Sequence, residues 1–304
     1  MKRIKDGFRL LGQSWQVVRA EPALVGVMAL GLVLQLAAFA ALFLLFFQRT
    51  PEAEDFRWPG ILWLYPMMIA SGLVGAVAGG TVIATAMQRL EGHDASVRDG
   101  FRLTMSRFPQ LAGWTVFGSI VGIVINLIAE RLKLAGRLTA LLAGVAWVVV
   151  TMLVVPVLLF EDRGVFASIK RSAELVKQRW GEGVTGYGTM GVALMIVMVP
   201  LLVGAGALVA VDVALGVAVL VVVFLGTMFV ASTLGGVFNA ALYRYAAAGH
   251  ASGPFSEAQL GSTFVTKEER QRPARRAWRI VGLVLVAAYL VMKLLQATDV
   301  LPKG

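Results

Sequence analysis

The apolar residues of this chain gather into long runs that short polar connections separate. Several runs hold about 20 residues, which at a rise of ~1.5 Å per residue are enough for an α-helix to cross a hydrocarbon layer of ~30 Å. The pattern predicts an all-α fold, a polytopic transmembrane helical bundle with about six core spans and a seventh C-terminal span. The predicted spans are 24–47, 61–87, 111–129, 138–160, 184–210, 214–243 and 278–295. Glycines around 204–216 predict a tight turn or a partly re-entrant hairpin between the fifth and sixth spans.

Three segments of mixed polarity precede pairs of spans and resemble one another. The pentapeptide Asp-Gly-Phe-Arg-Leu occurs at 6–10 and again at 99–103, and a third segment at 162–180 keeps the pattern without the peptide. Basic amphipathic helices with aromatic apolar faces lie in the headgroup layer of a membrane. We therefore expect three interfacial helices. The apolar faces predicted for them are Ile4, Phe8, Leu11, Trp15 and Val18, then Val97, Phe101, Met105 and Phe108, then Phe166, Ile169, Ala173, Val176 and Trp180.

These segments divide the chain into repeated units. Each unit is an interfacial helix followed by a transmembrane hairpin, at about 1–94, 95–161 and 162–252. Because every unit begins on the same side, the repeats are expected to be parallel and related by an axis along the membrane normal. The predicted domains are a transmembrane core at 1–252, a basic cytoplasmic linker at 253–277 and a C-terminal transmembrane helix at 278–304.

Composition and charge agree with a membrane location and add an orientation. Hydrophobic residues make up 58% of the 304 residues and charged residues 15%, against about 45–50% and 25% in soluble proteins. With the N-terminus in the cytoplasm, 21 of the 28 Lys and Arg residues fall on the cytoplasmic side, as the positive-inside rule requires. We expect a multi-pass protein with a cytoplasmic N-terminus and with the first span as its own insertion signal. Topology and anionic headgroups account for the net charge of +10, so no nucleic-acid partner is expected.

Residues with catalytic or ligand-binding chemistry are few. The chain has no cysteine, which excludes disulfides and thiolate metal sites, and it carries no nucleotide-binding, hydrolase or metalloprotease motif. The two histidines, His93 and His250, each follow a glycine just past a predicted span. That position is typical of a left-handed helix cap; a metal-binding or proton-relay pair is the alternative. We expect no enzyme activity, no cofactor and no metal.

The candidate functional residues are aromatic or basic and lie at the ends of spans. Arg89 and Arg244 end their spans, where an arginine either snorkels to the interface or grips a lipid headgroup. Arg275 and Arg276 belong to the basic linker, which should attract anionic lipid. The candidate lipid-headgroup or interface residues are Phe8, Trp15, Arg89, Phe101, Phe166, Trp180, Arg244, Arg275 and Arg276.

Inside the spans, polar residues and prolines are expected to serve packing. Gln35, Asn126 and Asn239 are the most polar deep residues, and amides at such depth hydrogen-bond a neighbouring helix. A proline removes a backbone donor and kinks or breaks a helix. Pro66, Pro156 and Pro200 are therefore expected to bend or interrupt the second, fourth and fifth spans.

Several motifs resemble an uncharacterised family of prokaryotic multi-pass membrane proteins. They are Gly7-Phe8 to Ser14-Trp15, Gln88 to Gly92, Phe160 to Gly164 with Ile169 to Ser172 and Arg179 to Glu182, and Asn239 to Tyr245. The resemblance covers about residues 1–250 and is looser to the membrane domain fused to some glycerophosphodiester phosphodiesterases. It implies a membrane fold, a location in the cytoplasmic (inner) membrane of a prokaryote, and no functional residues.

Two functions remain open at this point, with an intramembrane enzyme as a distant third. The first is a non-enzymatic membrane protein that binds anionic lipid headgroups on the cytoplasmic side, in envelope homeostasis or as a scaffold. The second is a transporter or channel for a lipid or small solute, built from parallel repeats with proline-interrupted gates. The sequence identifies no protein partner and leaves a homo-oligomer open.

Overall fold

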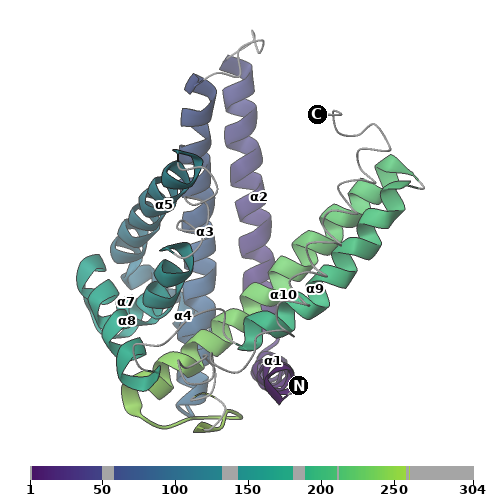
Figure 1. The fold of residues 1–304 in the computed structure, drawn as a ribbon. Helices are drawn as coiled ribbons and strands as arrows, with labels where there is room; N and C mark the ends of the chain where they lie inside the picture. The colour runs from purple at the N-terminus through teal and green to yellow at the C-terminus, as the bar shows by residue number, and fades with distance from the viewer. Residues whose placement is uncertain are drawn as a thin grey trace.

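The computed structural model describes residues 2–49, 58–131, 143–180, 189–210, 212–257 and 260, and within these ranges the regular elements are all helical (Figure 1). The helices are α1 Lys2–Ala20, α2 Ala23–Arg49, α3 Trp58–Leu90, α4 Val97–Ser106, α5 Phe108–Arg131, α7 Val154–Phe160, α8 Val165–Trp180, α9 Thr189–Ala207, the short 3₁₀ helix η1 Leu208–Ala210, and α10 Val213–Ala248. A further helical stretch at 143–151 precedes α7.

Five helical segments are long and apolar enough to cross a membrane: Ala23–Leu45, Ile69–Leu90, Phe108–Ile125, Ala143–Phe160 and Val213–Ala248. The prediction of an all-helical chain with several membrane-length apolar helices is thereby confirmed. In the described part of the fifth predicted span, 189–210, the apolar helix is a shorter one, Ala193–Ala207. The seventh, 278–295, lies outside the described residues.

The helices meet at one end of the molecule and separate toward the other (Figure 1). The pair α2 and α3 and the pair α9 and α10 are two long hairpins that diverge, while α1, α4, α7 and α8 lie toward the end of the molecule that carries the N-terminus. We call that end the N-terminal side and the diverging ends the open half. The main buried cluster lies on the N-terminal side, where 82–90 of α3, 153–159 around α7 and 234–246 of α10 pack together.

Each of the three short amphipathic helices packs against long helices. Helix α1 contacts α9 and α10, α4 contacts α3 and the edge of α2, and α8 contacts α7, α5 and α10. The contact of α4 with α3 is especially close, because a Cβ added at Gly100 would lie 2.1 Å from Thr85 Oγ1 and 2.9 Å from the Thr81 carbonyl oxygen. A glycine is therefore needed at this crossing.

The predicted apolar faces of these helices are wrong in part. Helix α1 buries Leu10, Ser14, Val17 and Val18, so Val18 is buried whereas the aromatic residues with which it was grouped are exposed. Small and aliphatic residues make the contact with the bundle because they allow close approach. Bulky aromatic residues stay on the adjacent, exposed face, as Phe8 does in α1.

The fourth predicted span is interrupted, as its proline predicts. The helix stops at a turn over Met152 and Leu153, and α7 begins at the next residue. Pro156 has no N–H to donate to the carbonyl of Met152, four residues earlier. Asn239 of α10 donates to that carbonyl from Nδ2 at 2.9 Å. The prediction that this deep amide bonds a neighbouring helix is thus confirmed.

A second side chain, that of Ser172, hydrogen-bonds the backbone on both sides of the break in this span. The buried hydroxyl of Ser172 in α8 donates to the Val150 carbonyl at 2.6 Å and accepts from the Leu153 N–H at 3.2 Å. Unpaired backbone groups are costly at membrane depth, so both bonds stabilise the break. By contrast, α3 and α9 continue through Pro66 and Pro200 without interruption.

The tight turn expected near 204–216 is present. Asp212 caps α10, its Oδ1 accepting the Leu215 N–H at 2.8 Å. The first turn of α10 lies directly against η1, since a Cβ at Gly216 would lie 2.3 Å from the Val209 nitrogen. A glycine at this position makes the tight connection sterically possible.

Candidate functional site

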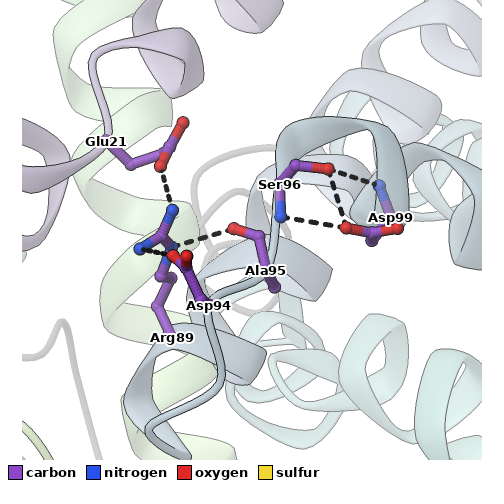
Figure 2. Close-up of polar contacts among 6 residues, drawn as sticks. All are labelled: Glu21, Arg89, Asp94, Ala95, Ser96 and Asp99. Atoms are coloured by element: carbon purple, nitrogen blue, oxygen red, sulfur yellow. Dashed lines mark hydrogen bonds and ion pairs between the residues drawn. The ribbon is translucent and has the colours of Figure 1, made fainter.

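Arg89, in the last turn of α3, joins three segments on the N-terminal side (Figure 2). Its guanidinium pairs with Glu21, from the turn between α1 and α2, and with Asp94 at 2.8 Å. Its Nε also donates to the carbonyl of Ala95 at 2.8 Å. The arginine therefore fixes the α3–α4 connection against the start of the first hairpin, and its guanidinium is engaged within the protein.

Arg244 has a similar role near the end of α10. It pairs with Glu91, just beyond α3, at 3.0 Å, and its Nε donates to the hydroxyl of Ser252. The contact joins the ends of the first and last long hairpins and the segment after α10. Both arginines that were predicted at headgroup level thus have acidic partners in the protein.

Glu161, directly after α7, is shared by several donors. Its carboxylate accepts from Arg163 Nε at 2.8 Å and Arg171 Nε at 3.1 Å. The Tyr243 hydroxyl of α10 donates to it at 3.2 Å, and the ring of Tyr243 stacks on Phe160 with centroids 5.9 Å apart. This half-buried carboxylate links α7, α8 and α10.

Two further arginines complete this arrangement. Arg179 of α8 donates from Nε to the carbonyl of Ala246 at 3.2 Å and lies over the Tyr245 ring, 5.6 Å from its centroid. Arg107 pairs with Asp162. Such partly exposed pairs contribute up to about 1 kcal/mol each, so they fix geometry more than they supply stability. We call the set the polar layer: Glu21, Arg89, Glu91, Asp94, Arg107, Glu161, Asp162, Arg171, Arg179, Tyr243 and Arg244.

The two histidines follow left-handed glycines, as predicted. Gly92 has φ 84° and Gly249 has φ 87°, and each follows the end of a helix. His93 is exposed and lies 3.8 Å from Glu91, and His250 is also exposed. Among the described residues, no group of three or more His, Asp or Glu side chains is placed to hold a metal ion.

A capping box begins α4, beside the polar layer (Figure 2). Asp99 accepts from the Ser96 backbone N–H at 3.0 Å and hydroxyl at 2.7 Å, while its own N–H donates to the Ser96 hydroxyl at 3.4 Å. The Ser96 hydroxyl bond, then the backbone bond, lower the pKa of Asp99, with a smaller contribution from Arg102. Arg98 lowers this pKa least of these groups, so the N-terminal turn of α4 is held mainly by Ser96.

The aromatic candidates remain on the surface. Phe8 and Trp15 of α1, Phe101 of α4 and Phe166 of α8 are 41%, 49%, 48% and 72% exposed. Phe166 also packs edge-on against Phe117, with ring centroids 5.0 Å apart. The side chain of Trp180 and the whole of Arg275 and Arg276 lie outside the described residues.

Two cavities flank the first hairpin. The larger, of about 620 Å³, lies between α2, α3 and the start of α4, and we call it the α2–α3–α4 groove. The smaller, of about 370 Å³, is a wedge between the first hairpin and α10, and it is lined by the polar side chains of Gln35, Ser71 and Ser232. Gly31 and Ala78 line both. A Cβ at Gly31 would lie 2.5 Å from that of Ala78, so this close helix contact separates the two cavities.

Sequence reasoning identified the arginines but missed their partners. Nothing in the local sequence marks Glu21 as the partner of Arg89, 68 residues away. Glu161 stood out only through the family resemblance, and the structural role of Ser172 was not recognised. Two signals in the sequence could have identified these residues. Glu21 is a lone acidic residue before an apolar segment, and Ser172 is a small polar residue on the apolar side of an amphipathic helix.

All of the polar layer except Glu21, and most of the helices, fall within a segment that is shared with other proteins. A family model described as "Family of unknown function (DUF6159)" matches residues 60–253, from the start of α3 to just beyond α10. No curated protein and no solved structure matches the chain. The expectation of an uncharacterised family is confirmed. A prokaryotic origin and a likeness to the phosphodiesterase-associated membrane domain stay predictions.

Proposed function

Since the chain belongs to this family of unknown function, we propose from its own geometry that it is a non-enzymatic integral membrane protein that binds anionic lipid headgroups on its N-terminal side. The observation that carries the proposal is the exposure of Phe8, Trp15, Phe101 and Phe166 on three helices whose opposite faces are buried in the bundle. Each exposed ring is positioned to enter the interface between headgroups and hydrocarbon, where aromatic side chains are favoured.

Basic side chains stand beside these rings. Arg9 and Arg19 of α1, Arg98 and Arg102 of α4 and Lys170 of α8 are exposed, while the arginines of the polar layer are engaged inside the protein. An exposed basic residue near an anionic membrane surface contributes about 1 kcal/mol of attraction. The combination of inserted rings and exposed cations favours phosphatidylglycerol-like lipids over neutral ones.

The packing of the short helices supports a three-unit architecture. In the proposed units, α1 rests on the hairpin of the third unit, α4 on that of the first and α8 on that of the second. This cyclic exchange is what three parallel units around an axis along the membrane normal would produce. We propose a core of six spans at 1–252, followed by the linker at 253–277 and a C-terminal span at 278–304, in a prokaryotic inner membrane and acting there as a scaffold.

Lipid retention tests the central claim. The protein, purified in mild detergent from membranes that contain phosphatidylglycerol, is analysed for bound lipid by mass spectrometry. Replacing Phe8, Trp15 and Phe101 by serine is expected to lower the retained anionic lipid several-fold. The matched variant with leucine at the same positions keeps the apolar area and should retain most of it. Wild-type retention in the folded serine variant would overturn the proposal.

The cysteine-free chain makes its orientation easy to test. Ser96→Cys, on an exposed residue of the N-terminal side, should be protected from an impermeant thiol reagent in intact cells, whereas Ala53→Cys should react. Ser172 is unsuitable for this purpose, because it is fully buried and would be protected in either orientation. The reverse labelling pattern would place the N-terminal side outside.

A lipid transporter is the second candidate, and the wedge beside α10 is the observation that favours it. Gln35, Ser71 and Ser232 place polar groups between two diverging hairpins, as a path for a headgroup requires. If the wedge is such a path, proteoliposomes should exchange a fluorescent phospholipid between leaflets faster than empty vesicles, and Gln35→Leu should slow the exchange. An unchanged rate on adding the wild-type protein would remove this candidate.

A further inference from the structure

The α2–α3–α4 groove has the position of a lipid-chain site. Leu30 and Leu34 of α2 form one wall, Val74 and Val77 of α3 the other, and Phe101 of α4 closes the end on the N-terminal side. The walls belong to two membrane-length segments, Ala23–Leu45 and Ile69–Leu90, so the groove opens at hydrocarbon depth. Its volume of about 620 Å³ lies in the range of ~300–1,000 Å³ that small-molecule sites occupy.

The chemistry of the lining selects a hydrocarbon. Among the described residues that line the groove, only Thr81 and Arg98 have polar side chains. The Thr81 hydroxyl already donates to the Val77 carbonyl at 2.8 Å. A polar solute in the groove would therefore lose its hydrogen bonds with water and find no replacement along the walls.

The length of the groove suits an acyl chain. From Leu73 to Thr81 it follows about 12 Å of α3 at ~1.5 Å per residue, and its walls are apolar over that length.

Arg98 places a positive charge at the mouth of the groove. It is exposed and stands in the first turn of α4, and no ion pair links it to another described residue within salt-bridge distance. Its neighbour Asp99 is engaged by Ser96. A guanidinium presents a fork of donors that suits the oxygens of a phosphate, and Arg102 follows one turn later.

We propose that this groove binds one acyl chain of an anionic glycerophospholipid, with the phosphate of the headgroup on Arg98. The inference rests on the proposed function and deepens it, because it turns general attraction to headgroups into one defined site. The lipid lies along α2 and α3, and α4 covers the junction between its chain and its headgroup.

Photo-crosslinking in nanodiscs tests the site. The full-length protein is placed in phosphatidylcholine discs that contain a small fraction of phosphatidylglycerol with a diazirine in one acyl chain, and the cross-linked peptides are mapped by mass spectrometry. We expect adducts concentrated on the groove faces of α2 and α3. The same probe with a phosphatidylcholine headgroup should give about fivefold less adduct, the effect expected of one nearby basic residue.

Paired variants separate the chain contact from the charge contact. Leu34→Trp fills the groove and should remove the adducts, whereas Val33→Trp, on the neighbouring exposed residue that does not line the groove, should leave them. Arg98→Gln should abolish the preference for phosphatidylglycerol and keep the chain adducts. Arg98→Lys and Arg102→Gln should largely keep both the preference and the adducts.

The outcomes distinguish this inference from the proposed function. Lipid adducts that spread evenly over the lipid-exposed faces overturn the groove site. So do adducts that are concentrated on a peptide outside the groove, and adducts that are unchanged in a monodisperse Leu34→Trp protein. The proposed function still stands if the serine variant at Phe8, Trp15 and Phe101 loses anionic lipid. If the serine variant retains anionic lipid like the wild type but the cross-linking results are as expected, the proposed function fails and the groove site stands.

Discussion

The N-terminal side and the open half of this protein are built from the same helices, yet they differ in what surrounds the apolar side chains. On the N-terminal side, Val82 of α3, Leu158 of α7 and Val237 of α10 are fully or almost fully buried in protein. In the open half, Leu44 of α2 and Val222 of α10 are exposed. The segments Ala23–Leu45 and Ala143–Phe160 have nearly the same mean hydropathy, although a much larger share of the second is buried in protein, so hydropathy alone does not tell protein contacts from lipid contacts.

The two regions differ in what their apolar side chains contact, and this difference follows from the residue types that each region contains. Small residues such as Gly100, and paired polar groups such as Glu161, occur where helices touch. Where the helices diverge, branched aliphatic residues project outward from α10 and glycines such as Gly226 have no neighbour within 4 Å of an added Cβ. Packing between several helices therefore specifies the N-terminal side, whereas the open half is held by contacts within each hairpin, such as that of Gly216 with η1, and presents an apolar surface.

The largest expected effect comes from adding one methyl group in each half. Gly100→Ala forces a Cβ onto Thr85 and the α3 backbone, and overpacking of this kind costs about 1–3 kcal/mol. Gly226→Ala, in the open half of α10 with nothing within 4 Å of an added Cβ, should be neutral or stabilise the helix by up to about 1 kcal/mol. Unfolding by SDS titration in mild-detergent micelles measures both. Equal effects would mean that the two halves are packed alike.

The next effect concerns the interrupted fourth span. Asn239→Leu removes the donor to the Met152 carbonyl, and we expect it to lower the free energy of unfolding by about 1 kcal/mol, as interhelical hydrogen bonds in membranes do. Pro156→Ala returns a backbone donor to the same carbonyl. In that background Asn239→Leu should cost much less, and the double-mutant cycle measures the coupling. Additive effects would contradict the link between the proline and the amide.

These two cases show why part of the fold was predictable and part was not. The apolar run at 61–87 lies inside α3 Trp58–Leu90, because burial in protein and exposure to lipid both demand apolar residues. The break near Pro156 follows from the missing N–H. The identity of Ser172 as a second partner, and the burial of Ser14 in α1, depend on which helix lies alongside, and no local pattern encodes that.

The polar layer should respond more weakly, and its response should depend on salt. Arg89→Gln removes the pairs with Glu21 and Asp94, and we expect a loss of about 1 kcal/mol at low ionic strength. The loss should shrink in 1 M salt, where the screening length falls to about 3 Å. Arg9→Gln is the matched control, since its pair with Asp6 at 3.6 Å involves a mostly exposed arginine. The same loss in both variants would mean that the polar layer does not hold the hairpins together.

The site was harder to predict than the fold for a related reason. Positive charge at helix ends serves topology, headgroup binding and ion pairing alike, so Arg89 and Arg98 have the same sequence signature. Only the structure distinguishes them, since Arg89 is engaged by two carboxylates and Arg98 lines an apolar groove. The aromatic residues Phe8 and Phe101 were recognisable because they occupy the same position in the two copies of the repeated pentapeptide, and both are exposed.

The smallest effect should appear at the edge of the packed half, in the capping box of α4. Hydrogen bonds from Ser96 lower the pKa of Asp99 below its ordinary value of 3.8. A carboxylate with a lowered pKa contributes stability above its unfolded pKa and loses it as the pH falls through the folded value. In the wild-type protein, amide exchange over 97–106 should therefore become faster only when the pH drops below about 4. The exchange of the Asp99→Asn variant at the same pH is the reference. Asp99→Asn should remove this pH dependence, and Ser96→Ala should weaken it, because the main cause of the shift is gone. If protection of α4 falls with acid equally in all three proteins, the acid response belongs to the contact of α4 with α3 and not to its cap.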